Sequence, residues 1–299
     1  MLELLFLALS NLSIPSLASH TQSSPSVVLT GWNPSEIPHV SAEKFWPLSQ
    51  KTSVLVRDMP SGETLVKNLP DSPRPIASLT KIMTFLIIIE EHDLDEAVTV
   101  TVEAAQAGGT GIGLISDETI TVYTLLEALL IPSANDAAVA LAIHNSGSEK
   151  IFVEKMNTRA KEWGLSSAKF HNASGLDFLD EVEKTPLVFN EMSAEDLIKI
   201  TRLALRYALF RQIVEKPYFT GYSIDRKIKH QGQNTNKLLG DEEIFSRGIK
   251  TGYTQSAGEC LIHWGRVNDR DVISIILGSD DRFGDTKKLM HWLEESVRW

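Results

Sequence analysis

Strand-type segments lie at both ends of this 299-residue chain, and helical patterns fill its middle. Near the N-terminal end, residues 53–57 and 64–67 are rich in Val, Leu and Thr and flank a Pro-Ser-Gly turn, which predicts a β-hairpin. Near the C-terminal end, residues 258–265 and 271–277 predict a second hairpin that turns at an Asn-Asp pair. Two strand pairs so far apart in the chain are most simply joined in one antiparallel sheet.

The residues between the two hairpins predict helices. Apolar residues at Ile82, Phe85, Leu86 and Ile89 recur at helical spacing. Four more helices in the middle, and one after the last strand, are predicted over 122–131, 135–145, 149–163, 194–209 and 286–297. The predicted fold class is therefore α/β (α+β): an antiparallel sheet flanked by helices, with an inserted all-helical lobe.

Charge and cysteine content exclude several classes of protein. The chain has 29 Lys and Arg against 39 Asp and Glu, a formal net charge of −10, so it lacks the basic surface that nucleic acid requires. Cys260 is the only cysteine, which rules out an intramolecular disulfide and a Cys-rich metal site, and its apolar neighbours predict a buried thiol. The longest apolar runs are a few residues long, so no membrane-spanning helix is expected in the mature chain.

A Ser-x-x-Lys motif, Ser78 to Lys81, begins the first predicted helix. Residues i and i+3 share one face of a helix, so Lys81 can reach the Ser78 hydroxyl. The start of a helix also offers free N–H groups and a positive dipole end, which suit an oxyanion. Two other Ser-x-x-Lys segments, at Ser41 and Ser166, do not begin a predicted helix. The alternative interpretation is that Ser78 only caps its helix.

Two further short motifs follow in the chain. Ser133-Ala134-Asn135 is the only Ser-x-Asn and precedes an Ala-rich predicted helix, so Ser133 is either functional or a helix cap. Lys250-Thr251-Gly252 is the only Lys-Thr-Gly and precedes the first late strand, so it is either a functional segment or a turn. Gly252 would let another backbone approach closely. Three such motifs in this order favour a function for all of them.

The three motifs resemble those of the serine-type D-Ala-D-Ala carboxypeptidases, the low-molecular-mass penicillin-binding proteins. The similarity covers roughly residues 40–298. It includes the segments around the motifs and two further landmarks: 75–84, 129–138, 172–176, 193–197 and 248–258. Arg247 departs from the family, which often has an acidic residue there. The resemblance implies a β-lactamase/penicillin-binding-protein transpeptidase-like fold.

The resemblance also implies a reaction on peptidoglycan stem peptides, without a cofactor or a metal. Ser78 is acylated by the penultimate D-alanine, the terminal D-alanine leaves, and water then hydrolyses the acyl-enzyme. Penicillins and other β-lactams acylate the same serine. Lys81 is the candidate base, and since a free lysine is protonated at pH 7, its pKa has to be lowered. Burial and the nearby cation of Lys250 would do this.

The same resemblance implies the roles of the remaining motif residues. Ser133 relays a proton to the leaving amine, and Asn135 orients Lys81 and the substrate amide. Lys250 and Thr251 hold the terminal carboxylate beside Gly252. The oxyanion hole is formed by the backbone N–H groups of Ser78 and Tyr253.

Three other functions compete with a carboxypeptidase. A murein D,D-endopeptidase of the same family carries the same motifs, although the segment 133–137 resembles the carboxypeptidase branch more. A class A β-lactamase should have Asp in place of Ala134 and a separate deacylating Glu, but Pro186 stands four residues before Asn190 where that Glu is expected. A non-catalytic binding module is disfavoured because none of the chemical positions is lost.

The N-terminal segment predicts where the protein acts. Residues 1–18 combine an apolar stretch with a small-x-small ending, which predicts a secretory signal peptide, although no Lys or Arg precedes Lys44. Residues 19–38 are rich in Ser, Thr and Pro and predict a linker. We therefore expect a single catalytic domain over 39–299, located outside the cytoplasm, in the cell envelope or periplasm or secreted.

Overall fold

A computed structural model of the protein describes residues 39–40, 46–178 and 187–299. The described residues all belong to one compact unit. The predicted signal peptide and linker lie outside the described residues, and so does the Ser-x-x-Lys segment at Ser41.

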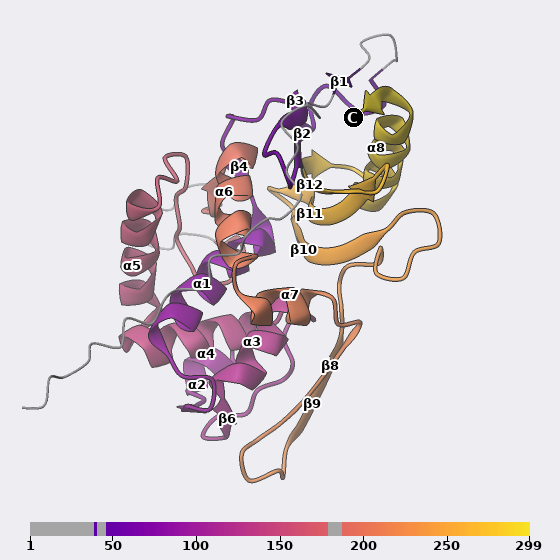
Figure 1. Ribbon diagram of the computed structural model, residues 1–299. Coiled ribbons are helices and arrows are strands. Elements are labelled where there is room, and N and C mark those ends of the chain that lie inside the picture. The colour runs from indigo at the N-terminus through magenta and orange to yellow at the C-terminus, as the bar shows by residue number, and fades with distance from the viewer. Residues whose placement is uncertain (1–38, 41–45, 179–186) are drawn as a thin grey trace, which may run out of the picture. The chain divides into compact units, whose positions relative to one another are not determined.

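The main sheet has five antiparallel strands in the order β10-β11-β12-β2-β3 (Figure 1). Their bounds are β2 Ser53–Asp58, β3 Thr64–Asn68, β10 Ser246–Thr254, β11 Gly258–Val267 and β12 Arg270–Ser279. The two ends of the chain meet where β12 pairs with β2, with Ile276 opposite Val54. The prediction of one sheet built from both ends of the chain is therefore confirmed.

The main sheet is buried on both faces because its apolar residues point alternately to two cores. In β2, Val54 and Val56 pack toward helix α8 (Arg282–Ser296), whereas Leu55 between them joins the core of the helical lobe. Figure 1 shows α8 on one side of the sheet and α6 with the start of α1 on the other. The Ser78 to Lys81 motif, at the start of α1, therefore lies on the second side.

The helical lobe lies between the two halves of the sheet in sequence (Figure 1). Its helices are η1 Ala77–Thr80, α1 Lys81–Glu91, α2 Val102–Ala105, α3 Val122–Leu130, α4 Asn135–Ser146, α5 Glu149–Glu162, α6 Ala194–Ala204 and α7 Ala208–Val214. Four two-stranded sheets accompany them: β1 His39–Val40 with β13 Val297–Arg298, β4 Arg74–Pro75 with β7 Glu191–Met192, β5 Ala97–Thr99 with β6 Thr119–Thr121, and β8 Tyr218–Tyr222 with β9 Lys229–Gln233.

Two predicted elements differ from the structure. The segment 194–209 is not one helix, because α6 ends at Ala204 and Tyr207 takes an extended conformation before α7. Lys250-Thr251-Gly252 does not precede the first late strand; it lies within strand β10, which the sequence did not reveal. Strand β10 is an edge strand of the main sheet. Its Gly-containing sequence has little strand propensity of its own, and pairing with β11 keeps it extended.

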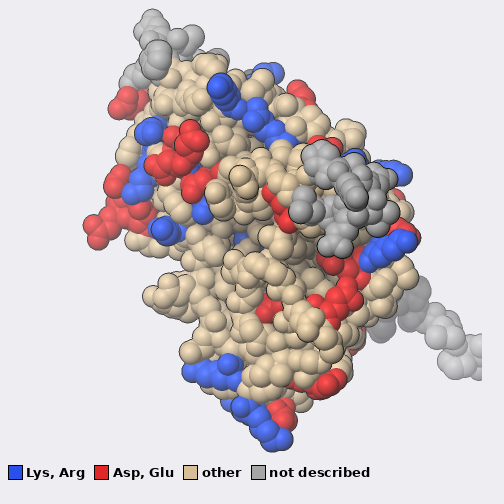
Figure 2. All heavy atoms as spheres, turned by 180° about the vertical axis from the view of Figure 1, so that it is seen from behind, with Lys and Arg blue, Asp and Glu red and all other residues tan. Residues whose placement is uncertain are grey.

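The surface carries charges of both signs. On the face that Figure 2 draws, basic and acidic side chains are interspersed rather than gathered in one broad basic patch. Among the helices of the described residues, none is long and apolar enough to cross a membrane.

Candidate active site

Ser78 lies in η1, the single 3₁₀ turn that leads into α1. Its hydroxyl caps neither helix, because the residues at the two cap positions are Ile76 and Thr80. Ala77 just before it has a φ of 47°, a left-handed conformation that costs energy for a residue with a side chain and is common at functional sites. The helix-cap interpretation of Ser78 is therefore wrong, and the hydroxyl is available for another partner.

That partner is Lys81, the first residue of α1. Its Nζ donates to Ser78 Oγ at 3.0 Å, to Asn135 Oδ1 at 2.7 Å and to the Ser174 carbonyl at 2.7 Å. The side chain is fully buried, and this burial lowers its pKa to about 7, although the carboxylate of Asp136 favours the charged form. Lys81 is thus uncharged in a large fraction of molecules at neutral pH, as a base has to be.

Asn135, the first residue of α4, is fixed from two sides. Its Nδ2 donates to the Gly108 carbonyl at 2.8 Å, so that its Oδ1 faces Lys81. The next residue, Asp136, is buried, and its carboxylate accepts N–H bonds from Ile112, Gly113 and Leu114. Asp136 therefore holds the loop that in turn holds the Asn135 amide.

Ser133 contacts the second buried lysine. Lys250 Nζ donates to Ser133 Oγ at 2.8 Å and to the Thr251 carbonyl at 2.9 Å. Ser133 has a φ of 64° and is not a helix cap, because Ala134 occupies that position. Each motif serine thus accepts a hydrogen bond from a motif lysine.

The pKa of Lys250 is lowered well below the ordinary value, first by burial and then by the charges of Lys81 and Arg282. The charge of Lys81 thus acts on Lys250, whereas the lowered pKa of Lys81 itself comes from burial. A carboxylate that enters the site would favour the charged form of Lys250.

Strand β10 runs alongside the start of η1. A Cβ on Gly252 would lie 2.9 Å from the Ile76 carbonyl oxygen and 3.2 Å from the Ser78 nitrogen, so only glycine fits without a shift. This approach brings the backbone of the next residue, Tyr253, close to Ser78, while the Tyr253 side chain is 64% exposed. Thr251 Oγ1 is 2.6 Å from Thr235 Oγ1.

An open cleft of about 430 Å³ leads to the serine. Ser78, Asn135 and Tyr253 line it, together with Gly175 and Leu176 from the loop after α5. The buried lysines therefore lie beneath a surface that a peptide-sized ligand can reach.

Several residues of the site were not predicted from the sequence. Asn190 donates to Thr80 Oγ1 and to the Asn172 carbonyl, and so ties the turn that carries Ser78 to the loop that carries the Ser174 carbonyl. Arg282, at the start of α8, donates from Nη1 to the Gly252 carbonyl oxygen at 2.7 Å. The segments 172–176 and 193–197 resemble family landmarks, but no pattern within them predicts these contacts.

Two other residues have structural explanations. Arg247 forms an ion pair with Glu215 at 2.6 Å and stacks over the ring of Trp264, so it packs the edge of the sheet. Cys260 is buried, as predicted, and burial raises the pKa of its thiol to about 11.

Comparison with known proteins gives a consistent result. The chain is 28% identical over 247 residues to a D-alanyl-D-alanine endopeptidase of Escherichia coli, covering 81% of this chain and 76% of that protein. It is 32% identical over 238 residues to the D-alanyl-D-alanine carboxypeptidase DacF of Bacillus subtilis, covering 77% of this chain but 57% of DacF. The crystal structure of a D-alanyl-D-alanine carboxypeptidase from Mycobacterium tuberculosis superimposes with a TM-score of 0.74 at 27% identity, covering 85% of this chain and 94% of the other.

The sequence profile of the D-alanyl-D-alanine carboxypeptidase family matches residues 41–281, which include all three motifs and most of the described fold. The fold class expected from the sequence is confirmed by the superposition on the Mycobacterium tuberculosis structure. This chain belongs to the D-alanyl-D-alanine carboxypeptidase family of peptidases.

Proposed function

We propose that the protein is a serine D-Ala-D-Ala carboxypeptidase that removes the terminal D-alanine from peptidoglycan pentapeptides. The observation that carries this proposal is the pairing of two buried lysines with two serine hydroxyls, at 3.0 Å for Lys81 with Ser78 and 2.8 Å for Lys250 with Ser133. The family and the named relatives support the same activity.

In the acylation step, neutral Lys81 takes the proton of Ser78 Oγ as this oxygen attacks the carbonyl carbon of the penultimate D-alanine. The negative charge on the carbonyl oxygen is stabilised by the backbone N–H groups of Ser78 and Tyr253, and losing one such donor typically costs about 2.7–4 kcal/mol. The C–N bond then breaks, and the leaving amine takes a proton by way of Ser133.

Substrate recognition follows from the charges. The terminal carboxylate of the substrate binds at Lys250 and Thr251, and Arg282 adds a second positive charge nearby. Asn135 holds Lys81 and donates to the substrate amide. Water completes the cycle by hydrolysing the ester on Ser78 and releasing the shortened peptide. None of these steps needs a cofactor or a metal.

The β-lactamase alternative has no support in the site. Among the described residues, no carboxylate hydrogen-bonds to Ser78 or Lys81, and the Ser174 carbonyl occupies the third position around the Lys81 ammonium group. Within that part of the chain, no glutamate therefore contacts Ser78 or Lys81 directly.

Peptidoglycan lies outside the cytoplasmic membrane, so we place the site of action there. The signal peptide over residues 1–18 and secretion of the mature chain remain predictions that follow from this location.

The proposal is tested by incubating the protein with a labelled penicillin and with muropeptides. We expect one covalent adduct on Ser78, none on the Ser78→Ala variant, and release of free D-alanine from uncross-linked pentapeptide faster than cleavage of cross-linked dimers. If dimers are cut and no D-alanine appears, the protein is the endopeptidase, as the Escherichia coli relative is named. An adduct that persists on Ser78→Ala contradicts the assignment of the nucleophile.

A further inference from the structure

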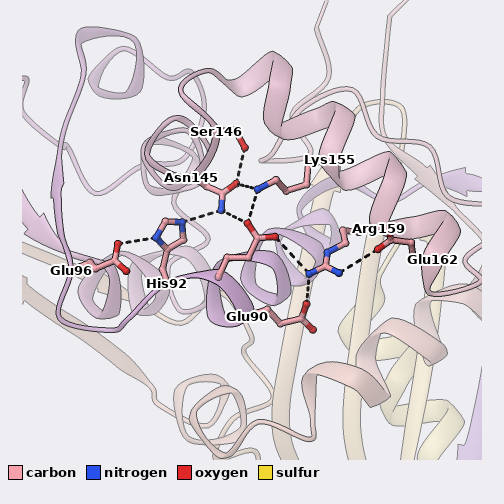
Figure 3. Close-up of polar contacts among 9 residues, drawn as sticks. Glu90, His92, Glu96, Asn145, Ser146, Lys155, Arg159 and Glu162 are labelled. Carbon is pink, nitrogen blue, oxygen red and sulfur yellow. Dashed lines mark hydrogen bonds and ion pairs between the residues drawn. The ribbon is translucent and has the colours of Figure 1, made fainter. Parts of the chain in front are cut away.

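Two imidazoles and one carboxylate converge at the ends of α1 and α4 that lie away from Ser78. His92 is the residue that ends α1, His144 lies in the last turn of α4, and Glu96 follows α1 in the loop before β5. Glu96 Oε2 is 2.8 Å from His92 Nδ1 and 3.2 Å from His144 Nε2. In Figure 3 the His92 ring points at the Glu96 carboxylate.

The spacing of the three atoms suits a single metal ion. Each residue offers one ligand atom, and these atoms all lie within 4.8 Å of one another. A tetrahedral ion with ligands at about 2.0–2.2 Å holds its donors about 3.4 Å apart. Small rotations of side chains that already face one another are therefore enough to enclose an ion.

The charge around the cluster also favours a cation. The neighbouring acids are matched by bases: Glu91 pairs with Lys155, and Glu90 pairs with Arg159. Within the described ranges, Glu96 has no Lys or Arg at ion-pair distance, and the groups that contact its carboxylate are the two imidazoles and the Asp93 N–H. A glutamate is ordinarily ionised at neutral pH, so Glu96 offers an anionic oxygen to a cation.

The direction of α1 and α4 also favours a cation at this cluster. Both histidines lie at helix C-terminal ends, where the aligned peptide dipoles leave partial negative charge that stabilises cations. The side chains are partly exposed, at 14% for His92, 23% for His144 and 38% for Glu96, so an ion from solution can reach them.

Asn145 fixes the outer side of the His92 ring. Its Nδ2 donates to His92 Nε2 at 3.0 Å, while its Oδ1 accepts from Lys155, so the His92 proton is on Nδ1 and points at Glu96 (Figure 3). When a metal binds Nδ1, this proton moves to Nε2, and the Asn145 amide has to turn so that its oxygen accepts it.

We propose that His92, Glu96 and His144 bind one divalent transition-metal ion of the Zn²⁺ type. Two imidazole nitrogens and a carboxylate oxygen are ligands that Zn²⁺ accepts in proteins, with water in the remaining position. The ion joins the C-terminal ends of α1 and α4 and takes no part in the reaction at Ser78, because α1 alone separates the two places by about 16 Å.

The test is a titration of the full-length, tag-free protein with Zn²⁺ by isothermal calorimetry, and with Co²⁺ by visible absorption. We expect about one ion per chain and a higher unfolding temperature with Zn²⁺ than with a chelator. His144→Ala and Glu96→Gln should each weaken binding on the order of tenfold or more. The matched control is His291→Ala, which removes an exposed histidine on α8 outside the cluster and should leave the affinity unchanged.

Circular dichroism of each variant shows that it is folded, and penicillin labelling of Ser78 should be the same with Zn²⁺ and with chelator. The proposal is overturned if the wild-type protein binds no Zn²⁺ up to millimolar concentration. It is equally overturned if both cluster variants are folded and bind Zn²⁺ as tightly as the wild type. A failure of Ser78 to react with penicillin would count against the proposed function and not against the metal site.

Discussion

Helices α1 and α4 lie side by side and run in the same direction, so their two ends can be compared directly. At the N-terminal ends, Lys81 and Asn135 are buried and 2.7 Å apart. At the C-terminal ends, His92 and His144 are partly exposed, with ring centroids 4.8 Å apart. The same dipoles thus place partial positive charge beside Ser78 and partial negative charge beside the histidines. Burial is the main difference, because it lowers the pKa of Lys81 to about 7 while water screens the exposed ion pairs at the other end.

Removing Lys81 should have the largest effect on activity. In Lys81→Met no base remains beside Ser78, so we expect penicillin acylation to fall by roughly 10³-fold or more. His144→Ala at the opposite end of the helix pair should change the acylation rate less than about twofold. The rate of adduct formation, measured by mass spectrometry, gives both values. A similar loss of rate in a folded His144→Ala would show that the two ends are coupled.

Glycine substitutions near the two ends of this helix pair should lower the free energy of unfolding by different amounts. Gly175 has a φ of +85°, and a Cβ there would lie 1.9 Å from the Ala77 carbonyl oxygen. We expect Gly175→Ala to lower the free energy of unfolding by about 3 kcal/mol or more, because backbone has to move beside Ser78.

Gly147, which follows α4, is the matched control, because its φ is +78° and no atom beyond its two chain neighbours lies within 4 Å of the added Cβ. Gly147→Ala should cost only about 1–2 kcal/mol, the cost of the left-handed conformation itself. Urea unfolding measures both variants. Equal losses would mean that the contact with Ala77 adds nothing.

The buried Lys81 should also give stability a distinctive pH dependence. Its pKa is about 7 in the folded protein and about 10.5 when exposed, so between these values the unfolded chain binds one more proton. Folded-state stability therefore rises with pH through this window, by about 1.4 kcal/mol per unit for this group. Relative to the wild type, Lys81→Met should be most stabilised at pH 7 and lose this advantage toward pH 10, as followed by urea unfolding. Parallel curves for the two proteins would contradict the lowered pKa.

The smallest expected effect is a shift of the pH–rate profile. The Asp136 carboxylate favours protonated Lys81, so Asp136→Asn should lower the pKa of Lys81. The acid limb of the acylation pH–rate profile should then move to lower pH by roughly half a unit. Lys250→Met removes the amine whose charged form an anionic ligand such as penicillin favours, and should move the limb to higher pH. Glu96→Gln at the far end should leave it in place. Shifts of the same sign in the first two variants would show that charge at these positions does not control Lys81.

The sequence predicted those parts of the site that depend on local spacing. Ser78 and Lys81 are three residues apart at the start of a helix, so their contact needs no tertiary information. The late hairpin was equally local, because an Asn-Asp turn accepts the positive φ values of 46° and 66° that Asn268 and Asp269 adopt.

The parts that escaped prediction depend on distant segments. Strand β10 contains two glycines and is extended only because β11 pairs with it, so its own residues do not indicate a strand. Asn190 acts through partners 18 and 110 residues away, and the Ser174 carbonyl is a backbone group that any residue type would supply. Asp136 is a similar case, since three of the N–H groups that donate to its carboxylate lie 22 to 24 residues earlier in the chain.

The pairing of β2 with β12 has a consequence for the order of folding. Strand β2 has a local partner in β3, but its pairing with β12 has to wait for residues more than 200 positions further along the chain. The neighbouring helices α3, α4 and α5 instead make contacts close in sequence. Loop closure over such a length is slow, so the helical lobe gains structure first and the sheet forms last. The cleft needs both β10 and η1, so an unfinished chain cannot bind penicillin. Pulse-labelling by hydrogen exchange during refolding should show protected amides in α4 before the β2 amides that bond to β12.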